Sequence, residues 1–250
     1  MKTIDFYSEG KWDKGSRERL LQREKIVLRL LQPHLKKGKR VLDVGCGAGR
    51  FLYQLNKRVQ NMELHGIDYS QVRIKKASTL PFKFKKANIE AGLPYEDNYF
   101  NIVYAGEVLE HLYNPDAFII EAKRILKKGG LLLLTTPNLC AWFNRIFMLF
   151  GIQPLFIESS TKSNKTGAGI LKKFKGPDPV GHLRIYNKTA IKDILKANGF
   201  EIIRIKGAIF ESLPFPLKSI DYIFSKFTGL SSGMIVLARN YLNKRRLKAR

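Results

Sequence analysis

The sequence predicts an α/β fold, in which helices cover both faces of a mostly parallel sheet and one lid-like insertion interrupts the order. Three observations support this prediction. An apolar run at 41–44 leads into Gly45, Gly47 and Gly49, as expected where a buried strand turns sharply into a helix. Short apolar segments then alternate with segments of helical periodicity. With 250 residues, the chain can bury the core of one such domain.

The elements of the first half follow from local signals. Apolar residues recur at helical spacing across 16–36, where Ser16 is a suitable N-cap, Pro33 perturbs the last turn and Gly38 ends the helix. Further along, apolar segments after turns indicate strands, and the segments between them indicate helices. We expect strands at 41–44, 64–70, 82–86 and 100–104, and helices at 50–58 and from residue 71.

The second half continues the alternation. Asn114 and Pro115 begin a helix that extends to about residue 127, where Gly129 and Gly130 end it, and a wholly apolar strand follows. Asn187 is the expected cap of a later helix. We expect strands at 131–136, 200–205 and 234–238, and helices at 114–127, 142–150, 187–197 and 221–227.

The chain is interpreted as a single domain, 1–250. Its parts are an N-terminal arm and helix (1–38), a core (39–137), an insertion (138–186), the C-terminal part of the sheet (187–238) and a basic tail (239–250). The insertion combines an aromatic helix with a flap rich in Ser, Thr, Lys and Gly at 159–169. This composition is typical of a lid, and an extra helix packed on the core is the alternative.

Several features bear on location. No apolar region of a signal peptide follows Met1, and no run of about eighteen apolar residues predicts a membrane span. Cys46 and Cys140 are too few for a disulfide framework and indicate a reducing compartment. We therefore expect a cytoplasmic protein, with peripheral attachment to a membrane left open.

The net charge of +24 is the unusual bulk property. Such a surface attracts polyanions, namely RNA, DNA, anionic lipid headgroups or phosphorylated sugars. The alternative is a solvated basic surface without a partner. The positive charge is densest at 162–175 and 239–250.

The motifs carry a family resemblance. The segment V-L-D-V-G-C-G-A-G at 41–49 resembles the first motif of class I S-adenosylmethionine-dependent methyltransferases. Its glycine spacing, G-x-G-x-G, differs from the G-x-G-x-x-G of dinucleotide-binding folds. The segments at 66–70, 93–103 and 124–138 are similar to later motifs of the same family. The resemblance, which extends to the ubiquinone-type O-methyltransferases, implies a Rossmann-like seven-stranded sheet whose last strand pair is antiparallel. It also implies S-adenosylmethionine as cofactor.

The resemblance assigns Asp68 to the ribose hydroxyls, for which an acid at the tip of the second strand is suited. The alternative role for Asp68 is the N-cap of the following helix. Asn88 stands where the family often has an acid that contacts adenine, and its side-chain carbonyl can accept that bond. The expected cofactor-binding residues are Asp43, Gly45, Cys46, Gly47, Gly49, Asp68, Tyr69, Asn88, Ile89 and Ala105.

Glu107, Glu110 and His111 share one face if their segment is helical, and His182 of the insertion could join them. Two carboxylates and imidazole suit a divalent metal ion, which would lower the pKa of an acceptor hydroxyl. The E-x-x-E-H pattern with a later histidine is similar to two metal-assisted branches of the superfamily, the ubiquinone-type quinone O-methyltransferases and the small-RNA 3′-terminal 2′-O-methyltransferases. We expect these four residues to be catalytic, and to be the ligands if a metal is used. The alternative has His111 as a metal-free general base or a core histidine.

The expected activity is methyl transfer to a hydroxyl of a small or lipid-linked acceptor, because the aromatic helices suggest an apolar pocket or a contact with a membrane surface. One alternative is an RNA methyltransferase that uses the basic surface. The other is a non-catalytic subunit that binds the cofactor. The segments 138–180 and both termini match no family that we can name.

Overall fold

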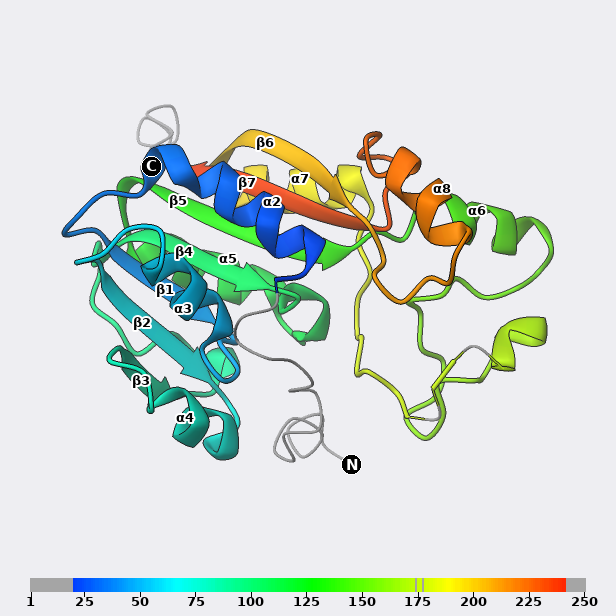
Figure 1. Cartoon of the computed structure of the whole chain (residues 1–250), viewed down its shortest axis with the longest axis horizontal. Coiled ribbons are helices and arrows are strands. Elements are labelled where there is room, and N and C mark those ends of the chain that lie inside the picture. The colour runs from blue at the N-terminus through cyan, green and yellow to red at the C-terminus, as the bar shows by residue number, and fades with distance from the viewer. Residues whose placement is uncertain (1–19, 174, 177, 242–250) are drawn as a thin grey trace, which may run out of the picture.

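The computed structural model describes residues 20–173, 175–176 and 178–241 (Figure 1). Seven strands within these residues form one sheet. The strand order is β3-β2-β1-β4-β5-β7-β6, and β7 runs antiparallel to both of its neighbours. The predicted fold and its antiparallel last pair are confirmed. The strands are β1 (Arg40–Val44), β2 (Glu63–Asp68), β3 (Lys83–Lys86), β4 (Phe100–Gly106), β5 (Leu126–Pro137), β6 (Phe200–Ala208) and β7 (Gly233–Asn240).

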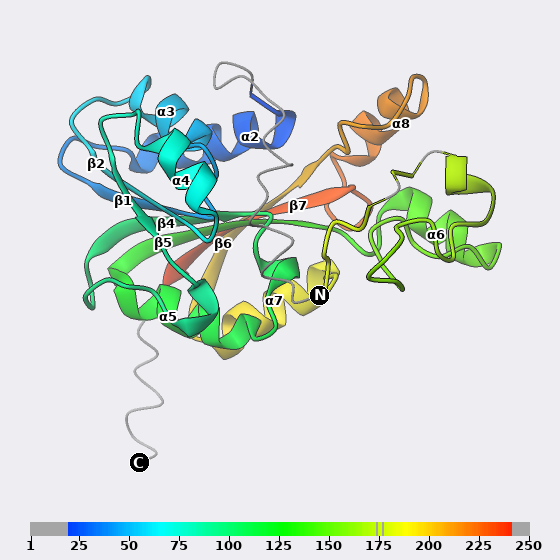
Figure 2. The same ribbon diagram turned by 90° about the horizontal axis from the view of Figure 1, so that it is seen from below.

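Helices cover both faces of the sheet, as predicted. In Figure 2, α2, α3 and α4 lie on one face, whereas α5 and α7 lie on the other. The α-helices are α2 (Gln22–Leu31), α3 (Arg50–Asn56), α4 (Gln71–Ala77), α5 (Pro115–Ile125), α6 (Trp142–Leu149), α7 (Lys188–Ala197) and α8 (Leu217–Phe224). The 3₁₀ helices are η1 (Gln32–His34), η2 (Ile89–Ala91), η3 (Leu109–His111) and η4 (Gly169–Lys173).

Two apolar cores separate the helices from the sheet. Side chains alternate along β4, so Ile102 and Tyr104 face the core under α2 and α3, while Val103 and Ala105 face the core under α5 and α7. All four side chains are buried. The central strands are therefore apolar on both sides, which explains their near-continuous hydrophobic sequences.

Some element boundaries differ from the prediction. Helix α2 ends at Leu31 and continues as η1, because Pro33 lacks the amide proton that an α-helix needs. Helix α5 ends at Ile125 and β5 begins at once, so Gly129 and Gly130 lie inside the strand rather than after a helix. Helix α8 begins four residues earlier than expected, directly after Pro216.

The insertion lies beyond the carboxyl end of β5. Its helix α6 is beside α8 in both views (Figures 1 and 2). The returning segment is not a strand, although His182, Arg184 and Tyr186 alternate: only Tyr186 forms a single bridge, with Asn138. Within the described residues, no helix combines the length and apolar character that crossing a membrane requires. The predicted arm at 1–15, Ser16 and the tail from 242 lie outside the described residues.

A substitution at Phe100 tests the packing of the larger core. This side chain is fully buried, and its ring contacts those of His65, Tyr95 and Tyr99. We expect Phe100→Ala to lower the free energy of unfolding by about 3–5 kcal/mol, because it leaves a cavity. Urea unfolding measures this loss. The exposed Ile120→Ala on α5 is the control, and an equal loss in both variants would contradict this account.

Candidate active site

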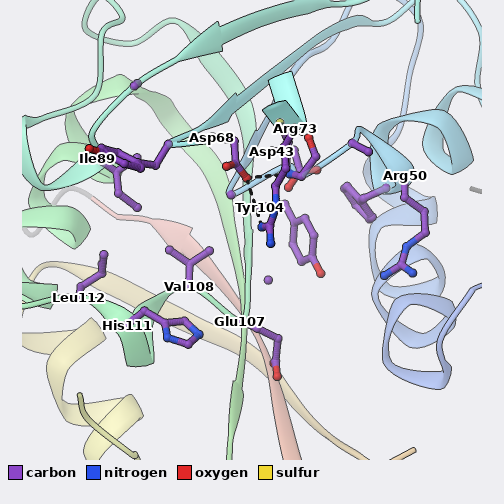
Figure 3. A pocket seen from close by; sticks show the side chains of 18 of the residues that line it. Asp43, Arg50, Asp68, Arg73, Ile89, Tyr104, Glu107, Val108, His111 and Leu112 are labelled. Carbon is purple, nitrogen blue, oxygen red and sulfur yellow. Dashed lines mark hydrogen bonds and ion pairs between the residues drawn. The ribbon is translucent and has the colours of Figure 1, made fainter. Parts of the chain in front are cut away.

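A cavity of about 810 Å³ opens at the carboxyl ends of β1, β2 and β4 (Figure 3). Open α/β sheets place their ligands at this edge, because loops that follow parallel strands converge there. Most of the predicted cofactor-binding residues line the cavity. They are Asp43, Gly45, Cys46, Gly47, Asp68, Tyr69, Asn88 and Ile89.

The glycine loop is shaped by left-handed backbone and close packing. Gly45 has a φ of 71°, and a Cβ atom there would lie 2.8 Å from a side-chain methyl of Val108. The backbone N–H groups of Gly45 and Cys46 both donate to the carbonyl of Ile67. A Cβ on Gly47, which has a φ of 54°, would instead meet no protein atom within 4 Å. The loop is therefore tightly packed at Gly45, whereas Gly47 borders empty space.

Asp68 joins the loop to the second strand. One of its carboxylate oxygens accepts the Gly47 N–H at 2.9 Å, and the other accepts the Ser70 N–H at 2.8 Å. Ser70, rather than Asp68, caps α4, because its hydroxyl accepts the N–H of Arg73. The Asp68 carboxylate therefore serves the cavity edge and leaves the helix cap to its neighbour.

Asp43 sits deeper in the cavity. Burial, and then the nearby Asp68 and Glu24, raise the pKa of its carboxyl well above the usual range, whereas Arg50 opposes the rise. Arg50 itself pairs with Glu24 at 2.6 Å. A cation that enters the cavity beside the buried acid Asp43 would stabilise the charged form of its carboxyl group.

Two predicted residues do not line the cavity. Gly49 precedes α3 with a φ of 80°, and a Cβ there would lie about 3 Å from the side chains of Leu80 and Phe84. Its role is to let the loop approach β3. Ala105 is buried within β4, between Val44 and Leu134 on the neighbouring strands.

The cavity also contains residues that the sequence did not single out. Arg23 on α2, Arg50 on α3, Arg73 on α4 and Tyr104 on β4 all line it. Two guanidinium nitrogens of Arg73 are buried without a hydrogen-bond partner in the described structure. In a chain with 45 Lys and Arg residues, no sequence signal marks these arginines, since only the fold brings them to the cavity.

A second group includes two residues of the cavity wall. Glu110, His111 and His182 each offer a ligand atom, and these atoms lie within 4.8 Å of one another. His111 and His182 line the cavity, whereas Glu110 is fully buried and does not line it. The Nδ1 of His111 is 2.9 Å from the carbonyl of Gly181, and that of His182 is 3.0 Å from the carbonyl of Phe156. A carbonyl can only accept, so each Nδ1 carries the proton and each Nε2 holds a lone pair when the ring is neutral.

The electrostatics of this group favour a neutral His111 ring. Burial, followed by the neighbouring His182, lowers the pKa of His111 to about 4. Burial and then Glu107 raise the pKa of Glu110 well above its usual range. Both carboxyl oxygens of Glu110 are buried without a hydrogen bond among the described residues; the Thr136 hydroxyl is close enough to affect that pKa but lies outside hydrogen-bond geometry.

Glu107 is separated from the other three predicted residues. The segment 107–111 does not form an α-helix: Glu107 has a φ of 55°, and a single 3₁₀ turn follows. Its carboxylate accepts the Thr135 hydroxyl at 2.8 Å and lies 3.4 Å from a nitrogen of Arg23. Glu107 still lines the cavity, at the boundary between its two halves (Figure 3).

The chain is similar to known proteins in sequence and in fold. A family model described as a methyltransferase domain matches residues 15–205. An uncharacterised methyltransferase of Schizosaccharomyces pombe is 38% identical over 109 residues, which are 39% of each chain. The ubiquinone biosynthesis O-methyltransferase of Roseobacter denitrificans is 25% identical over 206 residues, covering 78% of this chain and 75% of that protein.

A solved structure from Haloferax volcanii, of the Trm112 methyltransferase activator in complex with a methyltransferase, contains a similar chain. The TM-score is 0.65 at 14% identity, over 96% of this chain and 98% of the other. This likeness concerns the fold. The chain spans 39% of the length of the S. pombe relative, and 41% and 50% of two further curated relatives.

The pKa of His111 leads to a prediction for stability. Between pH 6.5 and 4 the unfolded chain protonates this histidine, whereas the native protein does not. Falling pH therefore favours the unfolded state, by at most about 3 kcal/mol. We expect His111→Gln to lose less stability than the wild type between pH 7 and pH 4.5 in urea unfolding. Identical pH dependence of the two proteins would contradict the lowered pKa.

Proposed function

The chain belongs to the class I S-adenosylmethionine-dependent methyltransferases, and from this premise we propose that it transfers a methyl group to a hydroxyl of a small or lipid-linked acceptor. The observation that carries the proposal is that one cavity is lined both by the glycine loop and Asp68 and by His111 and His182, which form a group with the buried Glu110. One half suits a cofactor, and the other half suits an acceptor.

The first half of the cavity fits the cofactor chemically. S-adenosylmethionine, when bound, supplies a methyl group on a cationic sulfonium beside a zwitterionic amino acid end. Asp43 is a buried acid whose charge such a cation would stabilise. Asp68 keeps further acceptor capacity after its two backbone bonds, which suits ribose hydroxyls. Gly47 leaves open space where any side chain would project.

The second half fits a hydroxyl acceptor. In the ion-free site the Nε2 lone pair of either imidazole can accept the proton that a hydroxyl must lose on methylation. An ion held by both Nε2 atoms would take the place of this base, because it would lower the pKa of the hydroxyl so that its proton is lost to solvent. Val180 and Leu112 add apolar lining next to them. The name of the Roseobacter relative, an O-methyltransferase of ubiquinone biosynthesis, supports an oxygen acceptor.

We also propose that Glu110, His111 and His182 hold a divalent metal ion. The two buried oxygens of Glu110 have no hydrogen-bond partner in the described part of the chain, which is costly unless a cation or a proton compensates. Both imidazoles donate Nδ1–H to backbone carbonyls, as metal-ligating histidines commonly do. A bound ion would lower the pKa of an acceptor hydroxyl. Glu107 is not part of this ligand set.

Asp68 provides the test of the cofactor site. We expect Asp68→Asn to weaken binding of S-adenosylmethionine or S-adenosylhomocysteine by about tenfold to a hundredfold in calorimetry, because a charged acceptor is lost. Glu96→Gln, at an exposed acid outside the cavity, is the matched control. Unchanged affinity in Asp68→Asn would contradict the assigned role.

The acceptor class is tested with methyl-labelled cofactor and fractionated host extract. Label in a lipid or small-molecule fraction supports the proposal. Label confined to RNA would instead support the alternative, an RNA methyltransferase that uses the basic surface. Binding of cofactor without transfer to any fraction would favour a non-catalytic subunit.

The metal is tested by titrating Mg²⁺, Mn²⁺ or Zn²⁺ into the ion-free protein. We expect one of them to bind with one-to-one stoichiometry, and Glu110→Gln to weaken that binding by at least about tenfold. Glu96→Gln is again the control. Absence of heat for every ion, or wild-type affinity in Glu110→Gln, would remove the metal from the proposal.

A further inference from the structure

Helices α6 and α8 bury polar residues and leave large apolar residues exposed. Asn144 of α6 and Asp221 of α8 are fully buried, and the only other buried residue of the two helices, which the structure describes in full, is Phe143 of α6. A surface helix normally buries its apolar stripe and exposes its polar one. The large side chains that the pair and its flanks leave exposed are Ile146, Met148, Leu149, Phe150, Phe215, Leu217, Ile220, Tyr222, Ile223 and Phe227.

This polarity is built in by specific bonds. The Asp221 carboxylate accepts the indole N–H of Trp142 at 2.9 Å, the backbone N–H of Phe210 at 2.7 Å and the hydroxyl of Ser232. The rings of Trp142 and Phe224 stack at 5.3 Å between the two helices. The helices are therefore fixed to each other and to the sheet, and cannot rotate their apolar faces inward without breaking these contacts.

The exposed side chains are large and come from two helices, and their flanks, that lie side by side in Figures 1 and 2. Leu149 of α6, Phe150 directly after it and Phe215 just before α8 are 83%, 76% and 85% exposed. Exposed apolar side chains gathered in this way mark a contact with a partner or a membrane. We define the exposed residues of α6, α8 and their flanks given above as the apolar end face.

The charges near the apolar end face indicate which kind of partner binds there. Both helices are described throughout, and their one acid, Asp221, is buried. Exposed basic residues belong to the same segments, namely Arg145 in α6 and Lys226 directly before Phe227. A second copy of this chain would bring another +24 charge against this one, whereas an anionic bilayer offers both an apolar interior and negative headgroups.

We propose that the apolar end face docks on an anionic lipid bilayer, inserting its aromatic and aliphatic side chains at the depth of the headgroups. Amphipathic surfaces bind membranes in this way when apolar area and basic charge act together. Tyr222 and Phe227 suit the interface, where aromatic side chains concentrate. The docking itself rests on this surface alone.

The position of the end face deepens the proposed function. The insertion that begins with α6 returns through Val180 and His182, which both line the cavity. Docking would therefore hold the acceptor half of the cavity near the bilayer, where a lipid-linked acceptor is concentrated. This last step, unlike the docking, rests on the proposed methyl transfer.

The test is co-sedimentation of the full chain with vesicles of phosphatidylcholine, with and without phosphatidylglycerol. We expect binding to the anionic vesicles that falls at high salt. The variant Leu149→Ser/Phe150→Ser/Ile223→Ser should bind at least about tenfold more weakly. The control Val72→Ser/Ile120→Ser alters exposed apolar residues on α4 and α5 and should bind as the wild type does. Lys226→Gln should weaken binding about fivefold.

Circular dichroism and cofactor calorimetry establish that the variants are folded. Equal sedimentation of the wild type with and without anionic vesicles would overturn the proposal, as would wild-type binding by the triple variant. A wild-type dimer that the triple substitution dissociates without lipid would instead assign the end face to a second copy. If vesicles bind but labelled methyl enters no lipid, the docking stands and the proposed acceptor class fails.

Discussion

The bond between the Asp68 carboxylate and the Gly47 N–H is the constraint on which the cavity depends. It connects the carboxyl ends of β1 and β2, two strands that are parallel and adjacent. Parallel pairing brings both ends to one edge, and the bond fixes the glycine loop against that edge. The same carboxylate holds the Ser70 N–H, so α4 begins at a defined place beside the cavity. The side chain of Asp68 thus sets the positions of a loop, a strand end and a helix.

The opposite half of the cavity is organised by a backbone carbonyl. Glu110 O accepts the N–H groups of Leu183 and Arg184 at 2.8 and 3.0 Å, which attaches the end of the insertion to η3. His182 is adjacent to this attachment and so is held near His111, with ring centroids 4.9 Å apart. The two histidines are 71 positions apart in the sequence, and three backbone groups are enough to bring them together.

The core of this arrangement could be predicted from the sequence because its signals are local. The strand, turn and helix at 40–56 are encoded by adjacent residues, and Asp68 follows from its place at a strand end. The Glu107 side chain could not be placed, because a helical spacing is informative only if the segment is helical, and a left-handed residue begins this one. The arginines of the cavity were missed for a different reason: each is brought there by a separate helix.

The insertion was the least predictable part, since the Asp221–Trp142 bond joins residues 79 positions apart. Its aromatic composition was consistent with a lid or with a packed helix, and composition does not say which side chains face outward. The structure ties down its first residues, through Asn138 and Trp142, and its last, through the carbonyl of Glu110. Between these ends, Phe156 and Glu158 hold His182 through its ring and its backbone N–H, and Val180 lines the cavity. A change of length between 159 and 179 would therefore disturb the site least, and this is where the insertion could acquire a new specificity.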